Sequence, residues 1–192
     1  VGEATWDILS GSVNPSGKLP ETFPLRLEDN PTYLSFNVDP KKEDYREGTF
    51  VGYRYYDKKK ISAAFPFGFG LSYTNFSFSG LSIKEVEGKL QGSVKVKNTG
   101  LIPGAEVVQV YGQNLASKVA MPKHFLVSFG KVTLSSGQTK SFAFTISKRN
   151  LSWYNSKTKS WQFDNGKYTI FVGNSSRNLV LSKNLTLNWS PK

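Results

Sequence analysis

The chain has 192 residues, of which 38% are hydrophobic and 14% are aromatic, and it contains no cysteine. This length supports one hydrophobic core, or one core with a smaller subdomain beside it. Without cysteine, the chain has no disulfide framework and no thiolate that could act as a nucleophile or metal ligand. Its stability must therefore come from packing.

Positive charge is concentrated in the second part of the sequence. The formal net charge is +11; residues 1–80 carry nine Lys/Arg and ten Asp/Glu, whereas residues 81–192 carry sixteen and four. Such a field can attract nucleic acid, anionic lipid or acidic polymers. Because the lysines are scattered singly through expected strands and turns, a solvated sheet surface explains them better, and we expect no nucleic-acid partner.

The sequence shows no membrane-spanning or targeting pattern. No apolar run is long enough to cross a bilayer, and the first residues show neither an initiator Met nor the basic-then-apolar order of a secretory signal. We expect no membrane contact, and both a cytoplasmic and a secreted location stay open. The chain reads as a piece of a longer protein.

The first part of the chain predicts an extended arm with little regular structure of its own. Residues 3–9 predict the last turns of a helix, which stops at Ser10 and Gly11. Residues 18–24 contain two prolines and predict a short edge strand or extended segment.

The next stretch is polar and then strongly aromatic. Residues 25–46 have little periodicity and predict a long ordered loop that lies on a neighbouring body. Residues 50–56 are rich in β-branched and aromatic side chains and predict a strand, with a turn at residues 57–60.

From residue 71 onward, alternation with period two predicts an all-β domain. Its first strand contains Phe76, Phe78, Leu81 and Ile83. Further strands are predicted at residues 90–97, 105–113, 125–134, 139–146, 167–172 and 179–187. Clusters of Asn, Ser and Gly separate them and favour turns. About seven short strands without a helical pattern predict an Ig-like or fibronectin-III-like β-sandwich.

Side chains suited to catalysis are few. His124 has no second His or Cys that would complete a metal site, so a loop or strand-edge role explains it best. Glycosidic hydrolysis needs two carboxyl groups flanking the scissile bond. Asp44, Glu47 and Asp57 qualify by residue type alone, and a surface role explains them much better; a structural or solvent-facing role likewise explains Glu106 better. We expect no cofactor and no metal.

Aromatic residues offer one binding motif. Trp153, Tyr154 and Trp161 flank a turn over residues 155–160, and sugar rings stack on exposed aromatic rings. The same pattern also fits core packing. We therefore keep a carbohydrate- or polymer-binding β-sandwich as the alternative function, in which this motif and the basic sheet form the binding surface.

Four segments, in this order, resemble glycoside hydrolase family 3. Residues 7–24 (DILSGSVNPSGKLPETFP) resemble the end of the family's α/β sandwich domain. Residues 45–57 (YREGTFVGYRYYD) and 65–76 (FPFGFGLSYTNF) are similar to its linker into a third domain. Residues 94–111, with VKVKNTG and GAEVVQVY, are similar to its fibronectin-III-like domain. The resemblance covers nearly the whole chain.

This resemblance implies a fold, a parent enzyme and a division of the chain. Residues 1–70 would be the C-terminal end of the α/β sandwich domain plus a linker arm, and residues 71–192 a fibronectin-III-like domain. The parent would be a retaining β-glucosidase-like enzyme acting on terminal β-D-glycosidic bonds. The motifs of its nucleophile and its acid/base group are absent from this sequence, so no catalytic residue is assigned here and the chain alone is expected to be inactive.

Within that family, the chain is expected to act as a structural module. Its partners would be the upstream catalytic domains, on the same or a separate chain, and a β-glucoside substrate would be met only through them; a homo-oligomer is a further alternative. Glu47 and Arg54 are candidates for the rim of the substrate pocket. Trp153, Tyr154 and Trp161 are candidates for sugar stacking.

Overall fold

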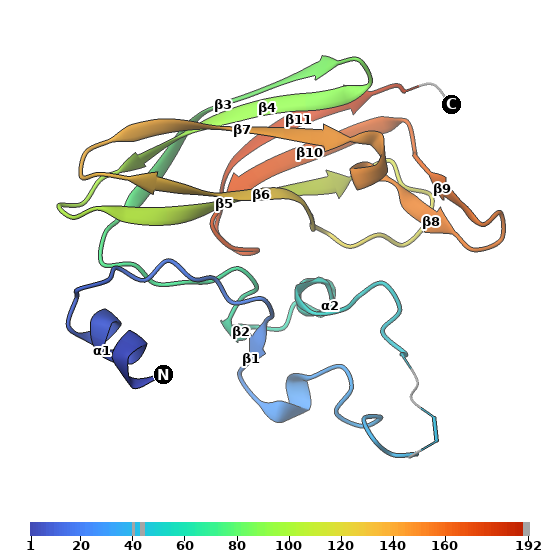
Figure 1. Ribbon diagram of the computed structural model, residues 1–192. Helices are drawn as coiled ribbons and strands as arrows, with labels where there is room; N and C mark the ends of the chain where they lie inside the picture. The colour runs from blue at the N-terminus through green and yellow to red at the C-terminus, as the bar shows by residue number, and fades with distance from the viewer. Residues whose placement is uncertain (40, 43–44, 190–192) are drawn as a thin grey trace.

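The computed structural model describes residues 1–39, 41–42 and 45–189, and it shows a β-sandwich with an N-terminal arm along one side (Figure 1). One sheet has the order β3-β4-β7 and the other has the order β11-β10-β5-β6, with neighbouring strands antiparallel. The strands are β3 (Phe76–Val86), β4 (Lys89–Asn98), β5 (Gly104–Asn114), β6 (Phe125–Leu134), β7 (Thr139–Ser147), β10 (Gly166–Gly173) and β11 (Leu179–Leu187). The predicted sandwich is thus confirmed, and each of its predicted strands is present.

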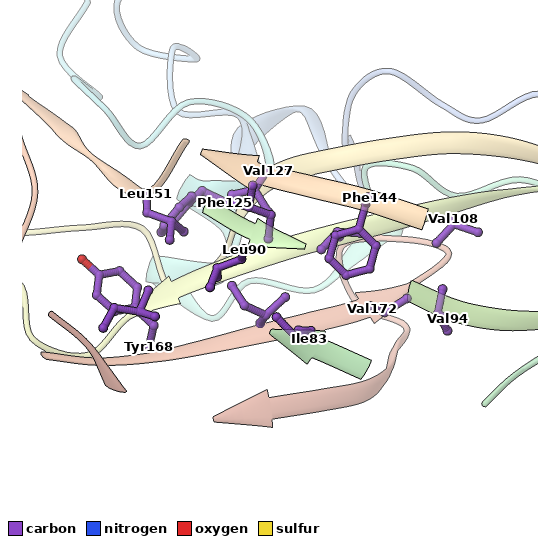
Figure 2. Packing of buried hydrophobic residues seen from close by; sticks show 14 of the residues in the cluster. Ile83, Leu90, Val94, Val108, Phe125, Val127, Phe144, Leu151, Tyr168 and Val172 are labelled. Atoms are coloured by element: carbon purple, nitrogen blue, oxygen red, sulfur yellow. The ribbon is translucent and has the colours of Figure 1, made fainter. Parts of the chain in front are cut away.

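Alternation of side chains along the strands builds the core. On β4, Leu90, Val94 and Val96 are buried, while Lys89 and Lys95 on the opposite face are exposed. This pattern is expected for a sheet with one face on a core and the other in water. The apolar faces of the two sheets meet between the layers, where Val108, Ile146, Leu151, Tyr168 and Val172 are fully buried (Figure 2).

A small hairpin extends from one end of the sandwich. A 3₁₀ turn, η2 (Lys148–Leu151), follows β7 and is capped by Ser147, whose hydroxyl accepts a hydrogen bond from the Asn150 amide. Strands β8 (Trp153–Asn155) and β9 (Ser160–Gln162) then pair antiparallel across the expected turn. They place the predicted aromatic motif on the protruding hairpin seen at the right of Figure 1.

The arm contains short elements. It begins with helix α1 (Gly2–Leu9), which ends at Ser10 as predicted. Strand β1 (Phe23–Pro24) lies in the segment predicted to be extended and pairs with β2 (Ala63–Phe65), a partner that the sequence pattern did not indicate. A 3₁₀ turn, η1 (Leu27–Asp29), interrupts the long loop.

The strand predicted at residues 50–56 is wrong, because this block forms helix α2 (Tyr53–Lys59) and the predicted turn at 57–60 is largely its last turn. Gly52 precedes the helix with a φ of 57°, and Lys60 ends it in the left-handed conformation. Tyr53 and Tyr56, three positions apart, share one face of the helix and are both buried. Burial of this tyrosine face outweighs the local preference for extended structure.

Within the described residues, no helix is both long enough and apolar enough to span a membrane.

Candidate functional site

The junction between the arm and strand β5 contains several buried polar side chains. Val108 and Val110 of β5 point into the sandwich core, whereas Gln109 and Tyr111 lie on the outer face of the sheet and are nevertheless buried. The arm covers them. The Gln109 amide donates to the carbonyl oxygens of Gly68 (3.0 Å) and Asn174 (2.7 Å), and Gln109 Oε1 accepts from the Tyr111 hydroxyl (2.6 Å).

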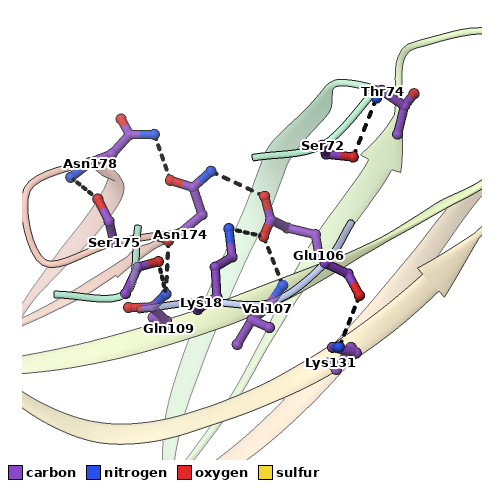
Figure 3. Close-up of polar contacts among 12 residues, drawn as sticks. Lys18, Ser72, Thr74, Glu106, Val107, Gln109, Lys131, Asn174, Ser175 and Asn178 are labelled. Atoms are coloured by element: carbon purple, nitrogen blue, oxygen red, sulfur yellow. Dashed lines mark hydrogen bonds and ion pairs between the residues drawn. The ribbon is translucent and has the colours of Figure 1, made fainter. Parts of the chain in front are cut away.

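A buried ion pair adjoins this contact. Lys18 Nζ of the arm lies 2.6 Å from Glu106 Oε1, and both side chains are mostly buried, with 13% and 6% exposed. Glu106 also accepts from the Val107 amide (2.8 Å) and from Asn174 Nδ2 (3.1 Å), as the dashed lines of Figure 3 show. Two buried charges are thus paired and supplied with further hydrogen bonds, which their removal from water requires.

Two glycines let the arm approach this closely. A Cβ at Gly68 would lie 2.1 Å from the Gln109 side chain, and Gly68 has a φ of 78°. A Cβ at Gly70 would lie 2.2 Å from the carbonyl oxygen of Gly17. The FGFG part of the sequence is therefore explained by close packing. A side chain at residue 68 would push the arm away from β5, and one at residue 70 would push apart two segments of the arm.

Asn14 secures the same junction nearer the N-terminus. Its Nδ2 donates to the Pro103 carbonyl (2.9 Å), and its Oδ1 accepts from the Ser72 hydroxyl (3.0 Å) and the Tyr73 amide (2.9 Å). One asparagine side chain thereby joins three segments that are distant in sequence. The NPSGK and GLSY motifs serve the docking of the arm.

A second polar cluster lies where helix α2 meets the sandwich. Arg177 donates from Nε to Asp57 Oδ1 (3.3 Å) and from Nη2 to the Ile61 carbonyl (2.6 Å). His124 Nδ1 lies 3.9 Å from Asp57 Oδ2, and both of these atoms are buried without a hydrogen-bond partner. Burial lowers the pKa of His124 and outweighs the attraction of Asp57, which acts in the opposite direction; Lys123 adds to the lowering.

An aromatic groove of about 620 Å³ separates the β8–β9 hairpin from the arm. The structure brings Arg54 to the same groove as Trp153, Tyr154 and Trp161. The Trp153 indole donates to Asp164 Oδ2 (2.9 Å), which fixes the hairpin. Tyr154 and Trp161 are instead 50% and 48% exposed. The remaining lining residues are Thr49, Val119, Ala120, Met121, Pro122, Phe125, Leu126, Arg149, Asn150 and Ser152.

The candidate carboxylates do not come together as a catalytic pair. Asp57 is engaged by Arg177 and Glu106 by Lys18, so both have structural partners. Glu47 is half-buried in a turn, where its carbonyl accepts from the Phe50 amide (3.0 Å). Asp44 lies outside the described residues. Among the residues that are described, no three His, Asp or Glu side chains gather in a group that could hold a metal ion.

The sequence pattern missed several residues that matter here. Arg149 lines the groove and stacks on Trp161, with 3.0 Å from its guanidinium carbon to the ring centroid. Lys18 and Gln109 carried no recognisable signal for their partners. Only the lack of alternation along residues 105–111, which is typical of a strand buried on both faces, could have indicated that something covers β5.

Two family models match separate parts of the chain. The glycosyl hydrolase family 3 C-terminal domain matches residues 1–73, and a fibronectin type III-like domain matches residues 106–176. The first contains the Asn14 and Lys18 anchors, and the second contains the Glu106, Gln109 and Asn174 side of the same junction.

Relatives and solved structures agree with these matches. Thermostable β-glucosidase B of Acetivibrio thermocellus is 45% identical over 196 residues, covering 100% of this chain and 26% of that protein. A structure of β-glucosidase from Kluyveromyces marxianus in complex with glucose superposes with a TM-score of 0.94 at 40% identity, covering 98% of this chain and 23% of that one. β-Glucosidase 3B from Thermotoga neapolitana gives 0.90 at 38% identity, with 96% and 26% covered.

A β-sandwich with a docked arm, matched along its length by such enzymes, defines a C-terminal segment of a multidomain glycosidase. The chain belongs to glycoside hydrolase family 3, and it corresponds to the C-terminal part of the family's β-glucosidases. It spans about a quarter of the length of the curated relatives that it matches.

Replacing Glu106 with Gln should destabilise the junction. The amide keeps the shape of the side chain and an acceptor for the Val107 amide, but it leaves the Lys18 ammonium buried without a counter-charge. We expect the free energy of unfolding in urea to fall by about 3 kcal/mol. Arg26→Gln, which removes the pair of the exposed Arg26 side chain with Asp29, should have a much smaller effect. Equal effects of the two substitutions would contradict a special role for the buried pair.

Acidification should destabilise the chain through His124. Its folded-state pKa lies below the ordinary value of 6.5, so the unfolded chain binds the proton more readily and stability is lost as the pH falls below that value. Thermal melts at stepped pH should show this loss, and His124→Gln should remove it. Because His124 is the only histidine, parallel melting curves for both proteins would show that its burial does not contribute.

Proposed function

We propose that this chain is the non-catalytic C-terminal module of a β-glucosidase-like enzyme and that it holds the catalytic domains in register. The parent would hydrolyse terminal β-D-glycosidic bonds, and its catalytic domains would be the partners of this chain. Two observations support this. The chain matches about a quarter of the length of such enzymes, and its carboxylates Asp57 and Glu106 are engaged in structural ion pairs.

One observation carries the proposal: the arm is anchored on the sandwich and still exposes many apolar side chains. Its anchored side binds the sandwich through Asn14, Lys18 and Gly68. Elsewhere the arm exposes many large apolar side chains, which are Trp6, Leu9, Leu25, Leu27, Leu34, Phe36, Val38, Tyr45 and Val51. So many apolar side chains on one connected segment are typical of a covered surface. In an enzyme of this family, the upstream domains would cover these apolar side chains.

We further propose that the boundary between the two parts lies near residue 71. Residues 1–70 would then be the end of the α/β sandwich domain with its linker arm, and residues 71–192 the fibronectin-III-like domain. The strands of the sandwich begin at Phe76, and the first family model ends at residue 73.

Leu34→Asp should have different effects in the 192-residue chain and in the full-length enzyme. Leu34 is 86% exposed in the chain, so the substitution should leave the unfolding of the 192-residue chain unchanged. In the full-length enzyme, the charge would be buried, and we expect a loss of about 2 kcal/mol or more in stability, together with lower turnover.

Val180→Asp on β11 is the matched control, because Val180 is an apolar residue of the sandwich itself and is 47% exposed. It should behave alike in both contexts. Deleting the module from the full-length enzyme tests the role more directly. If the truncated enzyme folded and turned over substrate as the intact one does, the structural role would be wrong.

Glu47 and Arg54 remain our candidates for the rim of the parent's substrate pocket. Both precede or begin helix α2, on the part of the arm that would face the upstream domains, and Arg54 lies over the Tyr53 ring at 5.8 Å. Glu47→Gln and Arg54→Ala in the full-length enzyme should change the ratio of kcat/KM among aryl and oligomeric β-glucosides. An unchanged substrate profile in both variants would exclude the rim role.

A further inference from the structure

The aromatic groove between the β8–β9 hairpin and the arm has features that a scaffold role does not require. Tyr154 and Trp161 are each about half exposed, and their ring centroids lie 5.3 Å apart with the planes tilted by 52°. Neither ring belongs to the buried core. The exposed surface of either ring can receive a flat apolar face of a ligand.

Arginine supplies the charge of this groove. Arg54 enters from helix α2 and Arg149 from η2, so two separate elements each contribute one guanidinium group. Neither forms an ion pair with a carboxylate in the described part of the chain, and no Asp or Glu is among the described residues that line the groove. The described lining of the groove therefore contains two arginines and no carboxylate, and the Asp164 carboxylate lies behind it, bound to the Trp153 indole.

The stacking of Arg149 on Trp161 strengthens this arrangement. A guanidinium that lies flat on a ring keeps its N–H donors in its own plane, where they can bind a carboxylate with two hydrogen bonds. Met121 and Pro122 add an apolar lining beside the rings. The groove thus offers ring faces, apolar lining and forked donors within one space of about 620 Å³.

We propose that this groove binds an acidic glycan, a chain of pyranose units that bear carboxylates. A pyranose presents an apolar face of C–H groups to an aromatic ring, and a uronate carboxylate matches the arginine fork. A neutral glycan would stack on the rings but would offer no negative charge to the two guanidinium groups. An acidic peptide would form ion pairs with the arginines but would offer the rings no flat apolar face to stack on. The proposal goes beyond the scaffold role and does not depend on it.

Affinity electrophoresis of the 192-residue chain tests the proposal with three soluble polymers. Polygalacturonate supplies rings and carboxylates, a mixed-linkage β-glucan supplies rings alone, and polyglutamate supplies carboxylates alone. We expect retardation by polygalacturonate that exceeds retardation by either control polymer. Part of it should persist at raised salt, which screens charge and leaves stacking in place.

Variants assign the binding to the groove. Trp161→Ala and Arg54→Ala should each weaken binding of polygalacturonate by about fivefold or more. Phe129→Ala removes an exposed ring from β6, and Lys97→Ala removes an exposed charge from β4; as matched controls, both should bind as the unchanged chain does. Urea unfolding of each variant checks that the fold is kept, and Arg149→Gln provides a second test should Trp161→Ala fail to fold.

Three results would overturn the proposal. If polyglutamate retarded the chain as much as polygalacturonate does, the binding would reflect the chain's net charge of +11 or a site for an acidic peptide. Equal retardation by the β-glucan, with no effect of Arg54→Ala, would show a neutral glycan site. If the matched control substitutions weakened retardation as much as the groove substitutions do, the binding would lie elsewhere on the chain.

Discussion

The burial of both faces of strand β5 is the constraint on which the rest of the structure depends. Its inner face, with Val108 and Val110, belongs to the sandwich core, and its outer face receives the arm. A polar outer face can be covered only if its hydrogen bonds are replaced, and Gln109 meets this need with two backbone carbonyls and the Tyr111 hydroxyl. Burial raises the pKa of Tyr111, which keeps its hydroxyl a donor at any ordinary pH.

This arrangement makes the arm and the sandwich one supporting body. The contacts with the sheet hold the arm in place, and the arm exposes apolar side chains that the sheet does not cover. In the function proposed above, such a surface would hold the last segment of the upstream catalytic domains in a fixed position. The aromatic groove is lined by residues of α2 and of the β8–β9 hairpin, so its shape also depends on how the arm docks.

Periodicity predicted the sandwich well because burial on one face leaves a clear pattern, as at Leu90, Val94 and Val96. It failed at residues 53–59, where tyrosines favoured a strand by composition while their contact with the sheet selected a helix. The three aromatics of the hairpin were recognised, but their association with Arg54 was not, because residues about a hundred positions apart give no local sign of contact. The same applies to Lys18 and Glu106, whose pairing depends on the docked arm.

The Asn14, Lys18 and Gly68 contacts have a consequence for the order of folding. Each joins the arm to residues at least about forty positions later, and Gln109 and Asn174 come together only when β5 and the β10–β11 turn are already neighbours. Closing such long loops is entropically unfavourable until the sheet exists to receive them. The sandwich should therefore form first and the arm dock last, so the amides of residues 67–70 should exchange their hydrogens sooner than those of β5.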